Sequence, residues 1–188
     1  GEGDVVKLRT PSGIEEIDLG AGDDVLDMNH PSFSYTDDII VRGGAGNDVI
    51  WTDQGDDTLD GGAGADRLDG GAGADTATYD GSAAGVTVNL TTGRGSGGDA
   101  QGDSLYGVEN LMGSDHADTL TGSADANTLT GGAGNDTLQG LGGNDLMIGG
   151  AGSDRFVIGE ADGDNMVKGG AGAGWTDTIQ LTNADASP

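Results

Sequence analysis

Large apolar residues recur every nine residues along two stretches of the chain. In residues 43–78 they are Ile50, Leu59, Leu68 and Ala77, and in residues 113–157 they are Leu120, Leu129, Leu138, Met147 and Phe156. Their immediate neighbours are mostly Thr, Asp or Arg, which gives the alternation of a short strand with one inward side chain. The pattern predicts an all-β chain in which one residue in nine faces the core.

Each of these residues belongs to a nine-residue block, or nonad, of the form G-G-x-G-x-D-x-U-x, where U is large and apolar. The first run reads GGAGNDVIW, TDQGDDTLD, GGAGADRLD and GGAGADTAT; the second reads GSDHADTLT, GSADANTLT, GGAGNDTLQ, GLGGNDLMI and GGAGSDRFV; a related block, LGAGDDVLD, occupies residues 19–27. Glycine permits the positive φ of a tight turn, and the sixth-position Asp places a carboxylate there. Two nonads make one coil of 18 residues, so like turns stack about 4.8 Å apart, the strand spacing of a sheet. The repeats therefore predict a parallel β-solenoid.

Composition restricts the partners of such a chain. Its 188 residues include 40 Gly, 33 acidic and 7 basic residues, for a formal charge of -26, and no Cys. Leu, Ile, Val and Phe make up only about 18% of the chain, a combination that is typical of disorder unless counter-ions are bound. The charge excludes nucleic acid as a partner, no apolar run approaches the roughly 18 residues of a membrane span, and disulfides and thiolate metal sites are excluded.

These nonads resemble the RTX repeats of bacterial proteins that are exported by type I secretion systems. The resemblance implies a right-handed parallel β-roll with Ca²⁺ bound between turns 18 residues apart. In that family the first turn contributes the carbonyls of positions two and four and its Asp, and the later turn contributes the carbonyls of positions one and three and its Asp. Such oxygen-only ligation suits Ca²⁺ and not Zn²⁺ or Cu²⁺.

Carried onto this chain, the resemblance implies three well-formed sites. They join Gly44, Gly46 and Asp48 to Gly61, Ala63 and Asp66; Asp53, Gly55 and Asp57 to Gly70, Ala72 and Asp75; and Gly132, Gly134 and Asp136 to Gly149, Ala151 and Asp154. Two further sites depart from the pattern because His116, Asp125 and Asn127 replace expected residues. They join Ser114, His116 and Asp118 to Gly131, Ala133 and Asp136, and Ser123, Asp125 and Asn127 to Gly140, Gly142 and Asp145. About five Ca²⁺ ions are expected, with extra ions at the run ends using Asp24, Asp38, Asp80 or Asp164.

The remaining segments are expected to complete a single solenoid domain. Residues 1–42 form an N-terminal cap and an irregular first coil, 43–78 the first run, 79–112 an inserted strand and loop, 113–157 the second run, and 158–188 a degenerate C-terminal cap. Within the insert, alternation in VTVNL (86–90) predicts a strand that covers one sheet, and the glycines from 93 to 102 predict an exposed loop. Leu105, Val108 and Leu111 favour coils that feed the second run. Two separate rolls are the alternative.

Three outward apolar residues and the last glycine-rich stretch complete this interpretation. Trp51 should be covered by the N-terminal segment or the insert, and Leu146 and Ile148 by residues 158–181, because exposed apolar residues on a solenoid invite association. The stretch GGAGAGWTDTIQL (169–181) keeps the glycine turn but has Gly174 at the sixth position, which indicates a cap. It also resembles the segment near the C-terminus of large RTX adhesins.

No arrangement of catalytic groups is evident. The sequence has neither an HExxH zinc motif nor a GxSxG elbow; His30 is expected to be solvated, and His116 to act through its backbone carbonyl. We therefore expect a non-enzymatic, monomeric, secreted or cell-surface module whose partners are calcium ions and the type I secretion apparatus of its parent. It would fold on binding Ca²⁺ outside the cell, as a structural segment of an adhesin or toxin. The alternatives are the C-terminal module of a secreted protease, lipase or epimerase, and a glycan-binding module, which would need an aromatic-lined groove.

Overall fold

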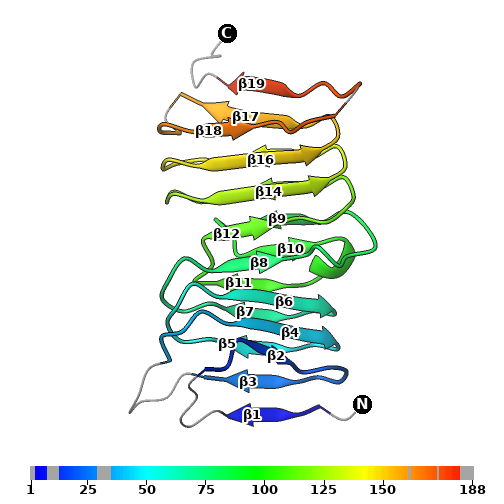
Figure 1. The fold of residues 1–188 in the computed structure, drawn as a ribbon, viewed down its shortest axis with the longest axis vertical. Helices are drawn as coiled ribbons and strands as arrows, with labels where there is room; N and C mark the ends of the chain where they lie inside the picture. Colours follow the sequence, from blue (N-terminus) through cyan, green and yellow to red (C-terminus); the bar gives the residue numbers. More distant parts are fainter. Residues whose placement is uncertain (1–2, 8–12, 29–34, 161, 173, 183–188) are drawn as a thin grey trace.

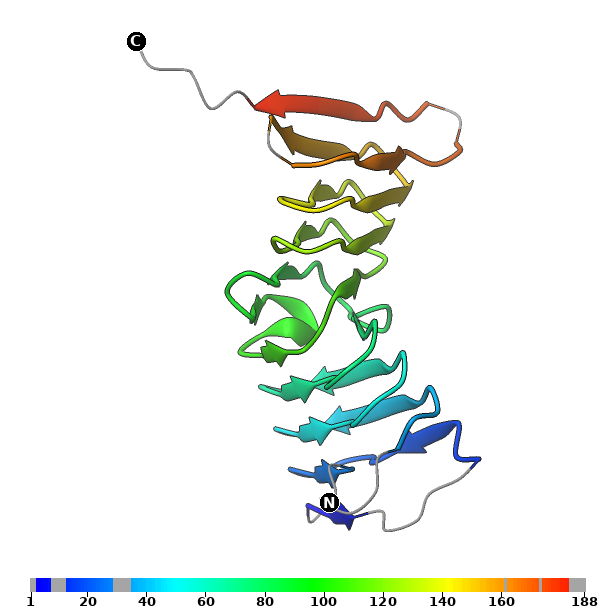
Figure 2. The same ribbon diagram turned by 90° about the vertical axis from the view of Figure 1, so that its left-hand side faces the viewer.

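The computed structural model describes residues 3–7, 13–28, 35–160, 162–172 and 174–182. Short strands stack across the long axis of an elongated β-solenoid, with β1 (Val5–Lys7) at one end and β19 (Thr178–Thr182) at the other (Figure 1). Turned by 90°, the solenoid shows two facing sheets joined by turns on either side (Figure 2). The predicted all-β parallel solenoid is confirmed.

Two sheets run along the described solenoid. The first has eleven strands in the spatial order β1, β3 (Val25–Asp27), β5 (Val49–Trp51), β7 (Arg67–Asp69), β11 (Ser104–Tyr106), β10 (Arg94–Ser96), β9 (Thr87–Asn89), β13 (Thr119–Thr121), β15 (Thr137–Gln139), β17 (Arg155–Gly159) and β19. The second has eight, in the order β18 (Met166–Lys168), β16 (Leu146–Ala151), β14 (Thr128–Ala133), β12 (Asn110–Met112), β8 (Thr76–Thr78), β6 (Thr58–Ala63), β4 (Ile40–Ala45) and β2 (Glu16–Asp18). Every pairing is parallel except the two made by β10.

The core is the column of eighth-position residues between the sheets. All nine residues expected to face inward have no solvent exposure. Within each run they pair with the equivalent residue one coil away, as Ile50 does with Leu68 and Leu120 does with Leu138. Alternation in a three-residue strand puts one side chain inward, and the 18-residue coil places like side chains in register. The low aliphatic content is thus sufficient for a core that is one side chain wide.

Residues 79–112 contribute strands to both sheets. The strand in VTVNL is β9, which lies in the eleven-stranded sheet between β10 and β13, so the expectation that it covers a sheet is wrong. The glycine-rich stretch is also more ordered than the exposed loop we expected, because it forms antiparallel β10 and a 3-10 turn, η1 (Gly98–Ala100), with Ala100 buried. β11 and β12 carry Leu105 and Leu111 into the core, and β12 pairs with β14 of the second run, which agrees with coils that lead into that run. Both sheets therefore continue through the insert.

The C-terminal segment covers the outward apolar residues of β16. Leu146 pairs with Met166 and Ile148 with Lys168 on β18, and both β16 residues are half-buried, as the sequence predicted. Met166 itself is exposed, as are Ile179 and Leu181 on β19. No helix in the described ranges is long and apolar enough to cross a membrane.

Candidate metal centre

A ladder of hydrogen bonds links the sixth-position side chains of successive coils. The Oδ1 atom of Asp66 accepts the backbone N–H of Asp48 at 2.8 Å, and Oδ1 of Asp136 accepts that of Asp118 at 2.9 Å. The same bond recurs at Asp48, Asp57, Asp75, Asp145 and Asp154. Because each bond spans one coil, the ladder fixes the height at which every carboxylate sits.

The second oxygen of most of these carboxylates has no donor. Within the described part of the chain, buried Oδ2 atoms without a hydrogen-bond partner belong to Asp24, Asp48, Asp57, Asp66, Asp75, Asp136, Asp145 and Asp154. We call the turns that hold them the unpaired turns. Burial raises the pKa of Asp66, Asp75 and Asp136 to about 7 each. A buried carboxylate with an unpaired oxygen is costly, and either a proton or a cation would stabilise it.

A backbone carbonyl from the next coil converges with that unpaired oxygen. A Cβ placed on Gly43 would lie 2.5 Å from both Oδ2 of Asp48 and the carbonyl oxygen of Gly61. A Cβ on Gly131 would lie 2.3 Å from Oδ2 of Asp136 and 2.6 Å from the carbonyl oxygen of Gly149. Glycine at position one therefore leaves room where two acceptor oxygens from adjacent coils face one another. Two acceptors repel unless a cation or proton lies between them.

The glycines at position two lie in the left-handed region, whereas Asp53, Ser114 and Ser123 at the same position do not. Gly62 has φ +81°, and a Cβ there would lie 2.1 Å from the carbonyl oxygen of Gly44, which points at the next coil. Leu141 occupies the same position with φ 70° and is the only non-glycine among the described residues with a positive φ. A leucine in that region is strained. The contacts between stacked coils must therefore outweigh the conformational cost of the positive φ at Leu141.

The donor set fits Ca²⁺. No three His, Cys, Asp or Glu side chains in the described ranges are grouped to hold a metal, so a cage here would combine single carboxylates with backbone carbonyls. Hard oxygen ligands of this kind suit Ca²⁺, which accepts many oxygens in flexible geometry. Some of the expected carbonyl ligands also accept backbone hydrogen bonds, as Ala63 does from Gly46 at 2.9 Å. A carbonyl has two lone pairs, so one such bond does not prevent ligation.

The expected residues fall into two groups. All the Asp residues of the three well-formed sites, except Asp53, are buried with an unpaired Oδ2, and so is Asp24, one of the expected run-end residues. Asp53, expected to contribute its carbonyl, accepts the N–H of Tyr35 with Oδ2. By contrast Asp38, Asp80 and Asp164 are exposed. His30 lies outside the described residues.

The two departing sites have a different local structure. Oδ2 of Asp118 accepts the N–H of Ser114 at 2.6 Å, and the Ser114 hydroxyl also bonds this carboxylate. Asn127 accepts the N–H of Ser123 at 2.7 Å. The exposed His116 donates its N–H to the Ser114 hydroxyl. The serine hydroxyls at position two are thus donors that a glycine would not supply.

Several ladder members were missed in the sequence. Asp103 accepts the N–H of Asp66, Glu109 that of Asp75, Asn165 that of Asp145, and Asp177 that of Asp154. We expected the ladder carboxylate to be missing at Gly174, but Asp177 supplies it, so the C-terminal segment continues the ladder. The signal was present as an Asp, Glu or Asn two residues before an apolar residue. Asp103, Asn165 and Asp177 stand out of phase with the nonads, whereas Glu109 lies one nonad before Asp118, in phase with the second run.

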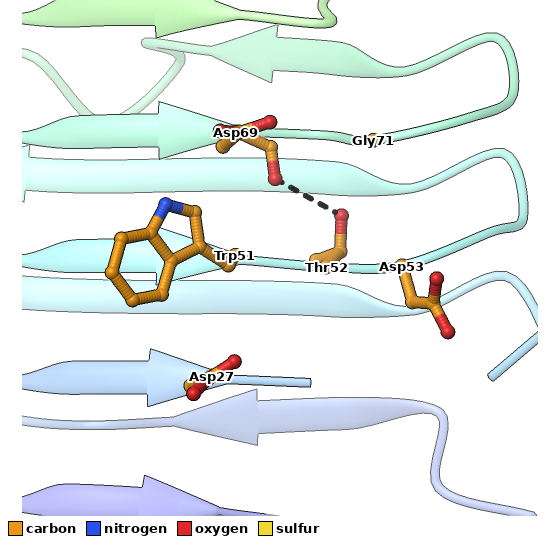
Figure 3. A pocket seen from close by; sticks show the side chains of 6 residues that line it. All are labelled: Asp27, Trp51, Thr52, Asp53, Asp69 and Gly71. Atoms are coloured by element: carbon orange, nitrogen blue, oxygen red, sulfur yellow. Dashed lines mark hydrogen bonds between the residues drawn. The ribbon is translucent and has the colours of Figure 1, made fainter. Parts of the chain in front are cut away.

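Trp51 borders a groove on the outer face of the eleven-stranded sheet. The groove has a volume of about 360 Å³ and is lined by Asp27, Trp51, Thr52, Asp53, Asp69 and Gly71 (Figure 3). The Arg67 guanidinium lies 5.8 Å from the Trp51 ring centroid and 4.0 Å from that of Tyr106. The cover on Trp51 thus includes Arg67 of the first run itself, with Tyr106 of the insert stacked on that guanidinium, whereas we expected the N-terminal segment or the insert alone.

Comparison with known families finds the same repeats. The model of the RTX calcium-binding nonapeptide repeat matches in four copies, at residues 42–77, 103–138, 112–147 and 121–156, which together span just under half of the chain. The second match begins at residue 103, inside the segment that we had set apart as an insert, and in its register Glu109 takes the sixth position that Asp48 takes in the first match. No curated protein matches the chain.

Proposed function

This chain is an RTX calcium-binding repeat protein with a β-roll fold, and from that premise we propose that it is a module whose folding is coupled to Ca²⁺ binding. One observation carries the proposal: the row of buried carboxylates whose second oxygen has no donor, which at Asp48 and Asp136 converges with a carbonyl of the next coil. Each such pair comes from two coils, so it does not exist in the unfolded chain, and the free energy of ion binding becomes free energy of folding.

The sites that we propose are those expected from the repeats. In each, the first turn contributes two carbonyls and a carboxylate, and the turn one coil later contributes the same number of each. The unpaired turns at Asp48 with Asp66, Asp57 with Asp75, and Asp136 with Asp154 are the best supported. Asp24 with Asp48 extends the series toward the N-terminus, and Asp154 with Asp177 extends it toward the C-terminus. We expect about five ions from the repeats, and the pairs at the two ends would add to that number.

The biological setting is a proposal of the same kind. Extracellular calcium modules bind at about 10⁻⁴ to 10⁻³ M, far above cytosolic free calcium. The chain would stay unfolded for export by a type I secretion apparatus and fold outside the cell as a monomer. We favour a structural segment of a secreted or surface adhesin or toxin over the C-terminal module of an extracellular protease, lipase or epimerase. The sequence upstream of this segment in its parent would decide between them.

The test is circular dichroism with light scattering, first in calcium-free buffer and then through a Ca²⁺ titration to millimolar concentration. We expect loss of β-signal and expansion without Ca²⁺, and cooperative recovery with it. Mg²⁺ at equal concentration is the matched control, since it demands octahedral geometry and dehydrates reluctantly. A fully compact, β-rich state in calcium-free buffer would overturn the coupling of folding to Ca²⁺.

The Trp51 groove favours a second candidate function, saccharide binding. An indole beside the carboxylates of Asp27, Asp53 and Asp69 offers a stacking surface and acceptors for sugar hydroxyls. Because Trp51 and Trp175 are the two tryptophans, a Trp175→Phe protein reports on Trp51 alone by fluorescence. In saturating Ca²⁺, a saturable change with neutral or amino monosaccharides but not with glucuronate would support this function. No change with any of these sugars would remove it.

A further inference from the structure

The centre of the solenoid satisfies its buried polar groups without any ion. Asp103 is fully buried, its Oδ1 accepts the N–H of Asp66 at 2.8 Å, and its Oδ2 accepts the hydroxyl of Tyr79 at 3.1 Å. Tyr79 is itself only 1% exposed. At this ladder position the phenol therefore supplies the donor that the unpaired turns lack, and it would be left without its partner if Asp103 moved.

The next two turns are completed in the same way. Oδ1 of Asp118 accepts the N–H of Val86 at 2.7 Å, and Oδ2 accepts the N–H of Ser114. Asn127 has an amide in place of a carboxylate oxygen, and its Nδ2 donates to the carbonyl of Glu109 at 2.8 Å. An amide can donate where a carboxylate can only accept. The substitution at Asn127 therefore adds a side-chain donor to this turn, while its Oδ1, which accepts the N–H of Ser123, is the oxygen that converges with the Gly140 carbonyl.

These turns define a continuous stretch, residues 79–127, which we call the central segment. All of it is described, and none of its buried side-chain nitrogen or oxygen atoms lacks a hydrogen-bond partner. On either side, every sixth-position Asp of residues 43–78 and 131–157 has an unpaired Oδ2. The difference in polar satisfaction thus follows the chain and is not scattered over it.

The central segment is also the most locally connected part of the solenoid. β9 and β10 pair antiparallel across a short turn, and β10 pairs with β11, so these contacts close over few residues. Tyr79, Val86 and Val88 are buried against the core, with Ala100 in η1 beside them. Contacts between residues close in sequence cost less chain entropy to form than contacts across a whole coil.

We propose that the central segment forms without Ca²⁺ and is the template on which both calcium-dependent runs assemble. It presents β11 and β12 to β7 and β8 of the first run, and β12 and β13 to β14 and β15 of the second. Each exposed strand edge then offers the backbone groups and the sixth-position side chain that the next coil needs. This inference rests on the proposed function, because it assigns the order in which the calcium sites form.

Hydrogen–deuterium exchange of the full chain, resolved by residue with NMR or by peptide with mass spectrometry, tests the proposal. In calcium-free buffer at neutral pH we expect amides of β9, β11 and β12 to exchange at least about tenfold more slowly than unstructured chain. Amides of residues 43–75 and 131–156 should exchange as unstructured chain. Saturating Ca²⁺ should protect all three stretches.

The outcomes separate this proposal from the previous one. Uniformly fast exchange without Ca²⁺ would overturn the template and leave calcium-coupled folding intact. Uniform protection without Ca²⁺ would overturn calcium-coupled folding itself.

Two tyrosine variants sharpen the result. Tyr79→Phe removes the donor to Oδ2 of Asp103, so it should abolish the residual protection without Ca²⁺ while the calcium-loaded chain still folds. Tyr106→Phe is the matched control, since Tyr106 lies on the outer face and is 45% exposed. Equal protection of the central segment in both variants would show that the Tyr79 hydroxyl does not hold it together, and would count against the proposal.

Discussion

The turn that holds Asp66 and the turn that holds Asp103 begin from the same hydrogen bond and complete the carboxylate differently. In both, Oδ1 accepts the N–H of the sixth-position residue one coil away, at 2.8 Å. Oδ2 of Asp66 has no donor and approaches Gly61, whereas Oδ2 of Asp103 bonds to the Tyr79 hydroxyl. Burial raises the pKa of both carboxyls, to about 7 for Asp66 and about 6 for Asp103.

The difference shows that the stability of a turn in the same repeat can either depend on a bound ion or be independent of it. A donor carried by the chain stabilises its turn under all conditions, but a donor-free turn is stable only when a proton or cation is supplied from outside. The formal charge of -26 has the same explanation. About five bound Ca²⁺ ions would supply about ten positive charges where the carboxylates are buried, so the acidic composition makes folding conditional.

The largest effect is expected from Asp136→Ala. Asp136 belongs to two of the proposed sites, and its Oδ1 also holds the N–H of Asp118. Two sites should be lost or weakened, which at free Ca²⁺ one hundredfold above Kd corresponds to about 3 kcal/mol for each ion lost. Calorimetric titration should report fewer Ca²⁺ per chain, and thermal unfolding in Ca²⁺ a lower Tm.

Asp125→Ala is the matched control for that substitution. Asp125 is exposed, and the repeat register assigns it only a backbone carbonyl as a ligand. The Asp125→Ala protein should therefore bind as many Ca²⁺ ions as the unaltered chain. An Asp136→Ala protein that binds as many ions as the control would contradict the proposed register.

The pH dependence of the unpaired turns should be opposite in sign with and without Ca²⁺. Burial raises the pKa of Asp66, Asp75 and Asp136 from 3.8 to about 7, so the calcium-free folded chain holds protons that the unfolded chain releases. Its stability is therefore greatest near pH 4 and is lost as pH rises through about 7. With Ca²⁺ present, protons compete for the same oxygens, and lowering the pH should raise the Ca²⁺ concentration needed for folding.

Circular dichroism in metal-depleted buffer between pH 4.5 and 8 measures the first trend, and Ca²⁺ titrations at pH 5.5 and 7.5 measure the second. β-content that rises with pH in the absence of Ca²⁺ would show that these carboxyls are not buried in the calcium-free chain.

An intermediate effect is expected from Asn127→Asp, which turns a completed turn into an unpaired one. The new carboxylate would face the Glu109 carbonyl at the site of a 2.8 Å hydrogen bond, so calcium-free stability should fall by about 1–3 kcal/mol. Saturating Ca²⁺ should restore most of that loss, because the ion expected between residues 127 and 145 would gain a carboxylate ligand. Urea unfolding in both conditions measures the two values, and an equal loss with and without Ca²⁺ would argue against an ion at this turn.

The sequence predicts the difference between the unpaired turns and the central segment only in part. Strict nonads predict the strands, the inward residues and the register of the runs, because the 18-residue coil repeats without interruption. Asp103, Glu109 and Asp177 were missed because the bonds that they accept span 37, 34 and 23 residues. The pairing of Tyr79 with Asp103 depends on β9–β11 being arranged antiparallel, and no local pattern in the chain encodes that arrangement. The irregular length of these coils, and not the type of residue at the ladder positions, limited the prediction.

The smallest effect is expected at Leu141, the strained position-two residue of an unpaired turn. Leu141→Gly should stabilise the calcium-loaded chain by about 1 kcal/mol, because glycine adopts φ near 70° without the clash that a Cβ makes. Leu141→Ala is the control, since it shortens the side chain and keeps the Cβ, and it should bring no such gain. Chemical unfolding in saturating Ca²⁺ resolves the two. If alanine stabilises as much as glycine, the gain comes from removing a partly exposed apolar side chain, and the left-handed turn is not under strain. If only glycine stabilises, the positive φ is imposed on Leu141 by the coils that stack against it.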